Sequence, residues 1–247
     1  MNIKLIVAYD GTSYKGWQKT GMGPSIENEL QVALERILQN PVKLQAASRT
    51  DAGVHAHGQV VNFLTEKEGI DLGKLCIGLN SLLPKDIVVF RADLVADSFH
   101  PTLDAKRKEY HYFLCHGHAQ MPHHRLYSWH YPHFLDVSLM RQAAGILCGK
   151  HDFSSFCNFK KNAAYSHYER IVDRIEIVQI EENRLRFSIT GSNFLYKMVR
   201  NLVGTIVYVG RGKIKLEEVS GVLQAQDRTQ AGVTTPAHGL FLHSVVY

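Results

Sequence analysis

The sequence lacks the features of a membrane or secreted protein. It has no apolar run long enough to span a bilayer, and its first residues lead directly into an alternating strand pattern instead of a signal peptide. Cysteine is scarce: there are four in 247 residues, and no two have C-x-x-C spacing. Such cysteines are typical of free thiols in a reducing compartment. We therefore expect a cytoplasmic protein with no membrane partner.

The sequence also lacks a large excess of basic or acidic residues. The formal net charge of +5 permits a polyanionic partner, but it fits any basic soluble protein equally well. Hydrophobic residues make up 45% of the chain and charged residues 21%, as in an ordinary globular protein. Together the basic residues could line a groove for a phosphate backbone. The candidates for such a groove are Lys15, Lys19, Lys106, Arg107, Lys108, Lys160, Lys161, Arg211 and Lys213.

Hydrophobic periodicity predicts an α+β protein. The order of elements in the first half is βαββαβ, which is that of a ferredoxin-like unit. Helix patterns follow Ser25 and Asp71, and both residue types are good N-caps. The expected strands are residues 3–8, 42–47, 59–64 and 87–92.

The second half repeats this order of elements without repeating the sequence. Its helix patterns cover residues 136–147, 194–209 and 216–223, and its strand patterns cover residues 106–114, 171–180, 185–189 and 241–246. We expect two α+β halves, residues 1–100 and 101–247, joined near residues 99–104. Two such halves would leave a cleft between their sheets, and clefts of this kind are common ligand sites.

One short motif carries the strongest chemical signal. Asp51 lies in the run Arg49-Thr50-Asp51-Ala52-Gly53-Val54-His55-Ala56, between two apolar stretches. A carboxylate in a tight loop between strands can act as a nucleophile. A strand-like backbone would point Arg49 and Asp51 the same way, so that the cation keeps the acid ionised. For an isolated R-x-D-x-G, a surface salt bridge in a glycine turn is the simpler interpretation.

The whole motif, followed by Gly58-Gln59-Val60, resembles the active-site signature of the TruA-type tRNA pseudouridine synthases. The resemblance covers nearly the full chain in the expected order. The other matching blocks are Tyr9-Asp10-Gly11 with Gly16-Trp17-Gln18, Leu79-Asn80 with Leu83-Pro84, Ser98-Phe99-His100 with Tyr110-His111-Tyr112, His151-Asp152-Phe153, Met198-Val199-Arg200-Asn201 and Ala237-His238-Gly239-Leu240. One departure is Pro101-Thr102, where the family often has an arginine, which puts one possible RNA contact in doubt.

The resemblance implies a fold and an activity. The fold is the pseudouridine synthase fold, with two α+β halves, an extended antiparallel sheet and a central active-site cleft. The activity is isomerisation of uridine to pseudouridine at positions 38, 39 and 40 of the tRNA anticodon stem-loop. The enzyme would be a homodimer. It would need no cofactor, because the isomerisation involves no redox change and no external energy. It would flip the target base out of the RNA helix, because a carboxylate in a protein pocket cannot reach a base that is buried in the stack.

The resemblance also assigns roles to four residues. Asp51 would be the nucleophile, attacking either the ribose or the pyrimidine ring. Arg49 would hold Asp51 ionised or fill the space left by the flipped base. Tyr110 would stack on the uracil and remove a proton from the ring carbon, although a lone strand tyrosine is more often a packing residue. Arg200 would form a salt bridge with Asp51, the alternative being amphipathic cover on its helix.

Two other classes of function compete with this one. A metal-dependent hydrolase could use Asp51 with the pair His55 and His57, but no second cluster at ligand spacing supports a metal, and we expect none. A non-catalytic RNA-binding protein could use two ferredoxin-like units, but no RNP1-like string occurs on any expected strand. The six histidines from His116 to His133 fit no zinc spacing and are more typical of an exposed loop that could contact phosphate.

Overall fold

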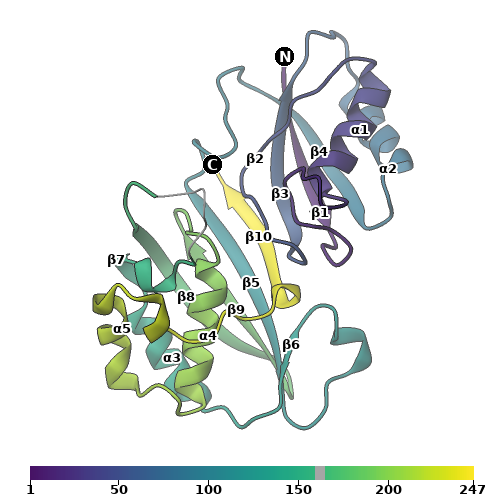
Figure 1. Cartoon of the computed structure of the whole chain (residues 1–247). Coiled ribbons are helices and arrows are strands. Elements are labelled where there is room, and N and C mark those ends of the chain that lie inside the picture. The colour runs from purple at the N-terminus through teal and green to yellow at the C-terminus, as the bar shows by residue number, and fades with distance from the viewer. Residues whose placement is uncertain (159–164) are drawn as a thin grey trace. The chain divides into compact units, whose positions relative to one another are not determined.

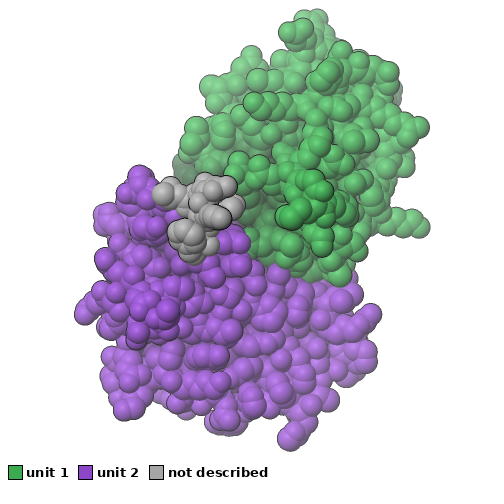
Figure 2. Space-filling view, viewed as in Figure 1, with its two compact units in different colours: residues 1–106, 241–247 green, residues 107–240 purple. Residues whose placement is uncertain are grey.

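The computed structural model describes residues 1–158 and 165–247. Lys160 and Lys161, two candidates for a basic groove, therefore lie outside the described residues. The chain divides into two compact units, coloured green and purple in Figure 2. Unit 1 comprises residues 1–106 and 241–247, and unit 2 comprises residues 107–240. The last seven residues thus return to the unit in which the chain begins.

Unit 1 is a sheet covered by two helices, in the predicted order βαββαβ. Its strands lie in the order β4 (Ile87–Val95), β1 (Asn2–Tyr9), β3 (His55–Leu64) and β10 (Leu240–Val246), and the short β2 (Gln45–Ala46) pairs with β3. The strands next to β1 are antiparallel to it, whereas β10 pairs with β3 in parallel. Helices α1 (Ile26–Leu38) and α2 (Leu72–Leu82) lie side by side in Figure 1.

Both helices of unit 1 begin where the sequence predicts. The Ser25 hydroxyl accepts a hydrogen bond from Asn28 N, and the Asp71 carboxylate accepts one from Lys74 N. The apolar stripes of the helices then cover one face of the sheet. Its core consists of fully buried side chains, among them Ile3, Leu5, Val7, Ile26, Leu30, Leu34 and Leu79.

The described residues of unit 2 likewise combine strands with helices. Its strands lie in the order β5 (Arg107–His116), β9 (Arg184–Gly191), β8 (Glu169–Glu181) and β7 (Gly149–Asp152), and β6 (Trp129–Tyr131) pairs in parallel with β5. Helices α3 (Val137–Ile146) and α4 (Met198–Gly210) pack together, and α5 (Val219–Ala225) follows. Short 3-10 turns are η1 (Pro122–His124), η2 (Ser154–Phe156), η3 (Leu216–Glu218), η4 (Arg228–Gln230) and η5 (Ala237–Gly239). The α+β class is therefore confirmed.

Two expected elements are clearly shorter in the structure than the sequence predicts. The strand expected at residues 42–47 is only two residues long, because the Val42 N–H bonds to the Glu35 carboxylate instead of a strand. The helix expected from Phe194 begins at Met198, because Lys197 has a left-handed backbone conformation, with φ of 61°. Among the described residues, no helix is both long enough and apolar enough to cross a membrane.

Candidate active site

Asp51 occupies a tight turn between β2 and β3. Its carbonyl accepts a hydrogen bond from Val54 N at 3.1 Å, and Gly53 provides the positive φ of 75° that this turn requires. The Asp51 side chain is half-buried, whereas Arg49 on the same loop is exposed. The loop therefore presents a carboxylate from a fixed backbone.

The turn near the N-terminus supports the Asp51 loop. Tyr9 Oη and Thr50 Oγ1 are 2.7 Å apart in the buried interior, and Trp17 N donates to Thr50 O at 3.0 Å. The two backbones approach so closely that a Cβ on Gly16 would lie 2.6 Å from Thr50 O. The first two motifs of the sequence are thus one structural unit, and Thr50 is its centre.

The other side of the Asp51 loop is fixed by Gln59 on β3. Its fully buried amide exchanges two hydrogen bonds with the backbone of Ser48, donating to Ser48 O at 2.6 Å and accepting from Ser48 N at 3.2 Å. The sequence motif contains Thr50 and Gln59 but indicates no role for either. Thr50 lies between the charged residues Arg49 and Asp51, which do not predict its burial, and its partner Tyr9 is distant in sequence.

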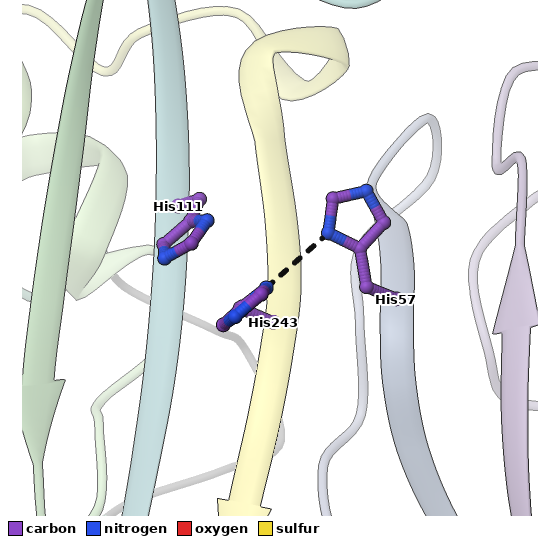
Figure 3. A group of neighbouring side chains, drawn as sticks. All are labelled: His57, His111 and His243. Atoms are coloured by element: carbon purple, nitrogen blue, oxygen red, sulfur yellow. Dashed lines mark hydrogen bonds between the residues drawn. The ribbon is translucent and has the colours of Figure 1, made fainter.

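The histidine pair beside Asp51 has protein partners. His55 is fully buried, with its Nδ1 3.0 Å from Gly11 N and 3.1 Å from the Asp10 carboxylate. His57 is exposed, and its Nδ1 lies 3.4 Å from Nδ1 of His243 on β10, the contact drawn as a dashed line in Figure 3. Phe241 lies against both rings of the pair, with centroids 4.5 Å and 4.8 Å away. His55 thus has a structural contact that fixes the start of β3.

Tyr110 belongs to unit 2, in the middle of β5. Its side chain is buried and meets the ring of Phe194 edge to face, with centroids 5.2 Å apart. Strand alternation places Lys108 and Tyr112 on the same face. Tyr112 is fully buried, as expected of a packing residue, and its hydroxyl donates to Pro236 O at 3.0 Å. Burial raises the pKa of the Tyr112 phenol far above its usual range, so this group stays a donor.

Arg200 lies in the first turn of α4 and is half-buried. Its Nε donates to Thr235 O at 2.7 Å, and the Thr235 hydroxyl donates back to Arg200 O at 3.2 Å. This reciprocal pair fixes the plane of the guanidinium. Burial, followed by the Arg200 charge, lowers the pKa of His238 in the same unit. Asp51 lies in unit 1 and Arg200 in unit 2, and their salt bridge stays a prediction.

The residues that are candidates for a basic groove differ in their exposure to solvent. The side chains of Lys15, Lys19, Lys106, Arg211 and Lys213 are exposed. Arg107 is exposed but pairs with Asp173 at 2.6 Å. Lys108 is buried, and burial lowers its pKa. Lys108 is therefore a poor candidate for a groove that binds a phosphate backbone, because alternation on β5 places it with the buried Tyr110 and Tyr112.

The histidine-rich segment (residues 116–133) is not a simple exposed loop. It contains η1 and β6, and His124 is buried. Arg184 of β9 holds the segment, with its Nη1 3.2 Å from His124 Nε2 and its Nε donating to Ser128 Oγ at 3.1 Å. The exposed side chains of His118, His123 and His133 fit the prediction, and His124 does not.

Comparison with known proteins gives a consistent result. The sequence profile of the family described as "tRNA pseudouridine synthase" matches residues 5–102 and 143–247. "tRNA pseudouridine synthase A 2" of Protochlamydia amoebophila is 54% identical over 246 residues, which cover 100% of this chain and 94% of that protein. "tRNA pseudouridine synthase A" of Thermoanaerobacter sp. is 43% identical, covering 100% and 99%, and "tRNA pseudouridine synthase A 1" of P. amoebophila is 43% identical, covering 99% and 95%.

Proposed function

The chain belongs to the tRNA pseudouridine synthases, which isomerise uridine in tRNA to pseudouridine, and from that premise we propose that it acts in the anticodon stem-loop with Asp51 as its nucleophile. The target uridines are those at positions 38, 39 and 40 of the tRNA. The observation that carries this proposal is the fixed, half-buried Asp51 carboxylate at the centre of the family motif.

The chemistry needs a carboxylate and a confined base. The bond from N1 of the uracil to C1′ of the ribose breaks, the base rotates, and a bond from C5 to C1′ forms. C5 then loses a proton and N1 carries one, so atoms balance and no electrons are transferred. Asp51 provides the nucleophile for the first cleavage, and the bond that it forms to the nucleotide breaks again before the product leaves, which regenerates the carboxylate. The hydrogen bonds of Tyr9, Trp17 and Gln59 support this role because they fix the loop before substrate arrives.

Three further residues have proposed roles around the target nucleotide. Tyr110 stacks on the flipped uracil and removes the proton from C5; its edge-to-face contact with Phe194 supports this role by fixing the ring plane. Arg200 pairs with Asp51 and keeps it ionised. Arg49 is exposed on the Asp51 loop and occupies the space that the flipped base leaves.

The partners follow from the same proposal. Action at three neighbouring positions implies recognition of RNA shape and backbone more than of base sequence. The exposed cations Lys15, Lys19 and Lys106 of unit 1 and Arg211 and Lys213 of unit 2 supply the charge for backbone contacts. The protein acts as a homodimer in the cytoplasm.

A mapping experiment tests the proposed substrate. Unmodified transcripts of several tRNAs, with uridine at position 38, 39 or 40, are incubated with the protein, and pseudouridine is located by chemical sequencing. The expected result is modification at these positions and nowhere else in the tRNA. A matched transcript with cytidine at all three positions is the control. Pseudouridine formed elsewhere in the tRNA would overturn the assignment to the anticodon stem-loop while leaving the family activity intact.

A further inference from the structure

The segment that holds Arg200 is itself anchored by a second arginine. Residues 231–236, which we call the crossing segment, run directly over α4. A Cβ on Gly204 would lie 1.7 Å from Val233 O, so the two backbones touch at this glycine. Gly232 N donates to the Thr205 hydroxyl at 2.9 Å on the same side of the helix. The crossing segment then reaches Thr235, whose carbonyl accepts from Arg200 Nε.

Arg228 lies just before the crossing segment, and all three of its guanidinium nitrogens donate hydrogen bonds within unit 2. Its Nη1 donates to Gly232 O at 2.9 Å and to Ala231 O at 3.4 Å. Its Nη2 donates to Thr234 Oγ1 at 2.8 Å and to Asn201 Oδ1 at 2.9 Å, and its Nε donates to Asn158 Oδ1 at 3.3 Å. All five acceptors are neutral oxygens. The hydrogen bonds of Arg228 therefore fix the positions of their acceptor groups and do not neutralise a carboxylate.

Asn201 links this arginine to the helix. It is fully buried on α4, next to Arg200, and its amide donates to Phe156 O and Asn158 Oδ1, both at 2.7 Å. Its Oδ1 accepts from Thr234 Oγ1 at 2.7 Å in addition to Arg228. Arg228, Asn201 and Thr234 thus form a closed polar network that joins the crossing segment to the first turn of α4.

We propose that Arg228 is the positioning residue for Arg200, fixing the Thr235 carbonyl that orients the Arg200 guanidinium. This inference rests on the proposed role of Arg200 in the active site. Arg228 acts on Arg200 through the crossing segment and through Asn201, and its effect on the reaction passes through the placement of Arg200. A displacement of about 1 Å at a positioned group can slow catalysis by about a hundredfold.

A double-mutant cycle tests this proposal. Arg228→Gln, Arg200→Gln and the double variant are compared with wild type in single-turnover pseudouridine formation on folded tRNA, with tRNA affinity and Tm measured in parallel. We expect Arg228→Gln to slow the reaction by about a hundredfold at little cost in tRNA affinity. In the Arg200→Gln background the same substitution should have almost no further effect on the rate. Arg36→Gln on the exposed face of α1 removes the same charge and should leave the rate unchanged.

The outcomes are distinct. If the rate losses of the two single variants multiply in the double variant, Arg228 contributes only general stability and the proposal is wrong. If wild type forms no pseudouridine, the proposed function fails instead, and if Arg200→Gln reacts at the wild-type rate, the role of Arg200 fails. Arg228→Lys keeps the charge but not the planar fork, so it serves if Arg228→Gln does not fold, and it should show the same non-additive loss. A wild-type rate for a folded Arg228→Lys would also overturn the proposal.

Discussion

At the scale of single residues, the two tyrosines of β5 differ in what holds them in place. Tyr112 is fully buried, and its hydroxyl has a backbone acceptor in Pro236. Tyr110, two residues earlier on the same face, is positioned through its ring by Phe194. A ring fixed in this way can stack on a base while its hydroxyl takes part in a proton transfer.

Substitutions at Tyr110 distinguish these two uses. Tyr110→Phe keeps the ring, so tRNA affinity should change little, but loss of the hydroxyl should slow the reaction by roughly 10²–10⁴-fold. Tyr110→Ala should additionally lose about 1–3 kcal/mol of base stacking. Single-turnover rates and tRNA affinities at fixed salt measure both effects. Equal rates for Tyr110→Phe and wild type would make Tyr110 a stacking or packing residue only.

At the scale of elements, the edge strand β4 is protected by a side chain of α2. Asn80 Nδ2 donates to Val89 O at 2.9 Å, and Val89 N donates to Asn80 Oδ1 at 2.8 Å. The Asn80 amide therefore takes the place of a neighbouring strand at this position. This contact explains why the Leu79-Asn80 block occurs in the sequence although it lies away from the Asp51 loop in the chain.

Asn80→Ala should weaken the β4 edge. Both hydrogen bonds to Val89 are lost, and at about 0.5–1.5 kcal/mol per bond the free energy of unfolding should fall by about 1–3 kcal/mol. Asn80→Asp keeps the acceptor for Val89 N and should lose roughly half as much. Denaturant unfolding of the three proteins measures the difference. A free energy of unfolding for Asn80→Ala equal to that of wild type would show that water replaces the amide at no cost.

The histidine-rich segment should respond to pH. Burial, followed by the Arg184 charge, lowers the pKa of His124, which Glu181 opposes and His123 reinforces. A histidine with a lowered pKa in the folded state takes up its proton first in the unfolded state. Stability should therefore be complete above the unfolded pKa of about 6.5 and fall as the pH drops through that value.

His124→Gln tests this response because glutamine can still accept from Arg184 but does not titrate. The fall in Tm between about pH 8 and about pH 5.5 should be smaller in this variant than in wild type. His133→Gln, at an exposed position, is the control and should behave like wild type. A fall in Tm that is the same for His124→Gln and wild type would assign the pH response to other groups.

Local sequence patterns predicted where helices and strands lie better than they predicted which strands and side chains meet. The caps Ser25 and Asp71 were found from the sequence because a cap depends on residues three or four positions away. The parallel pairing of Phe241 with His55 was not predicted, because no local pattern records which strand a terminal segment joins. The burial of Lys108 and the network of Arg228 were missed for the same reason. Both depend on neighbours distant in sequence.

At the scale of the whole molecule, the four residues proposed for catalysis come from two units: Asp51 and Arg49 from unit 1, and Tyr110 and Arg200 from unit 2. In unit 1, the blocks Tyr9-Asp10-Gly11 and Gly16-Trp17-Gln18 contact the Asp51 loop at Thr50. In unit 2, the block Met198-Val199-Arg200-Asn201 forms the first turn of α4. The full-length matches at 43–54% identity include both sets. The family signature is therefore distributed over the fold instead of being confined to the Asp51 loop.

The protein should need no metal ion. In the proposed mechanism the Asp51 carboxylate is itself the nucleophile, so no metal-activated water is required, and Nδ1 of His55 already contacts Gly11 N and Asp10. Dialysis against EDTA, followed by an assay in metal-free buffer with prefolded tRNA, should leave the rate unchanged. Added zinc is the control arm. Activity that disappears on dialysis and returns only with zinc would favour a metal site at the histidine pair and contradict the proposed mechanism.

The central claim is that Asp51 is the nucleophile of a tRNA pseudouridine synthase, and one paired measurement tests it most directly. Wild type and Asp51→Asn are assayed for tritium release from tRNA labelled at C5 of uridine, and both are titrated with the same tRNA. The amide keeps the shape of the side chain but is not an adequate nucleophile. If Asp51 is the nucleophile, wild type releases tritium, Asp51→Asn releases none, and the tRNA affinity of the variant is not weakened. Tritium release by Asp51→Asn within about tenfold of wild type, well short of the loss expected for a missing nucleophile, would contradict this claim.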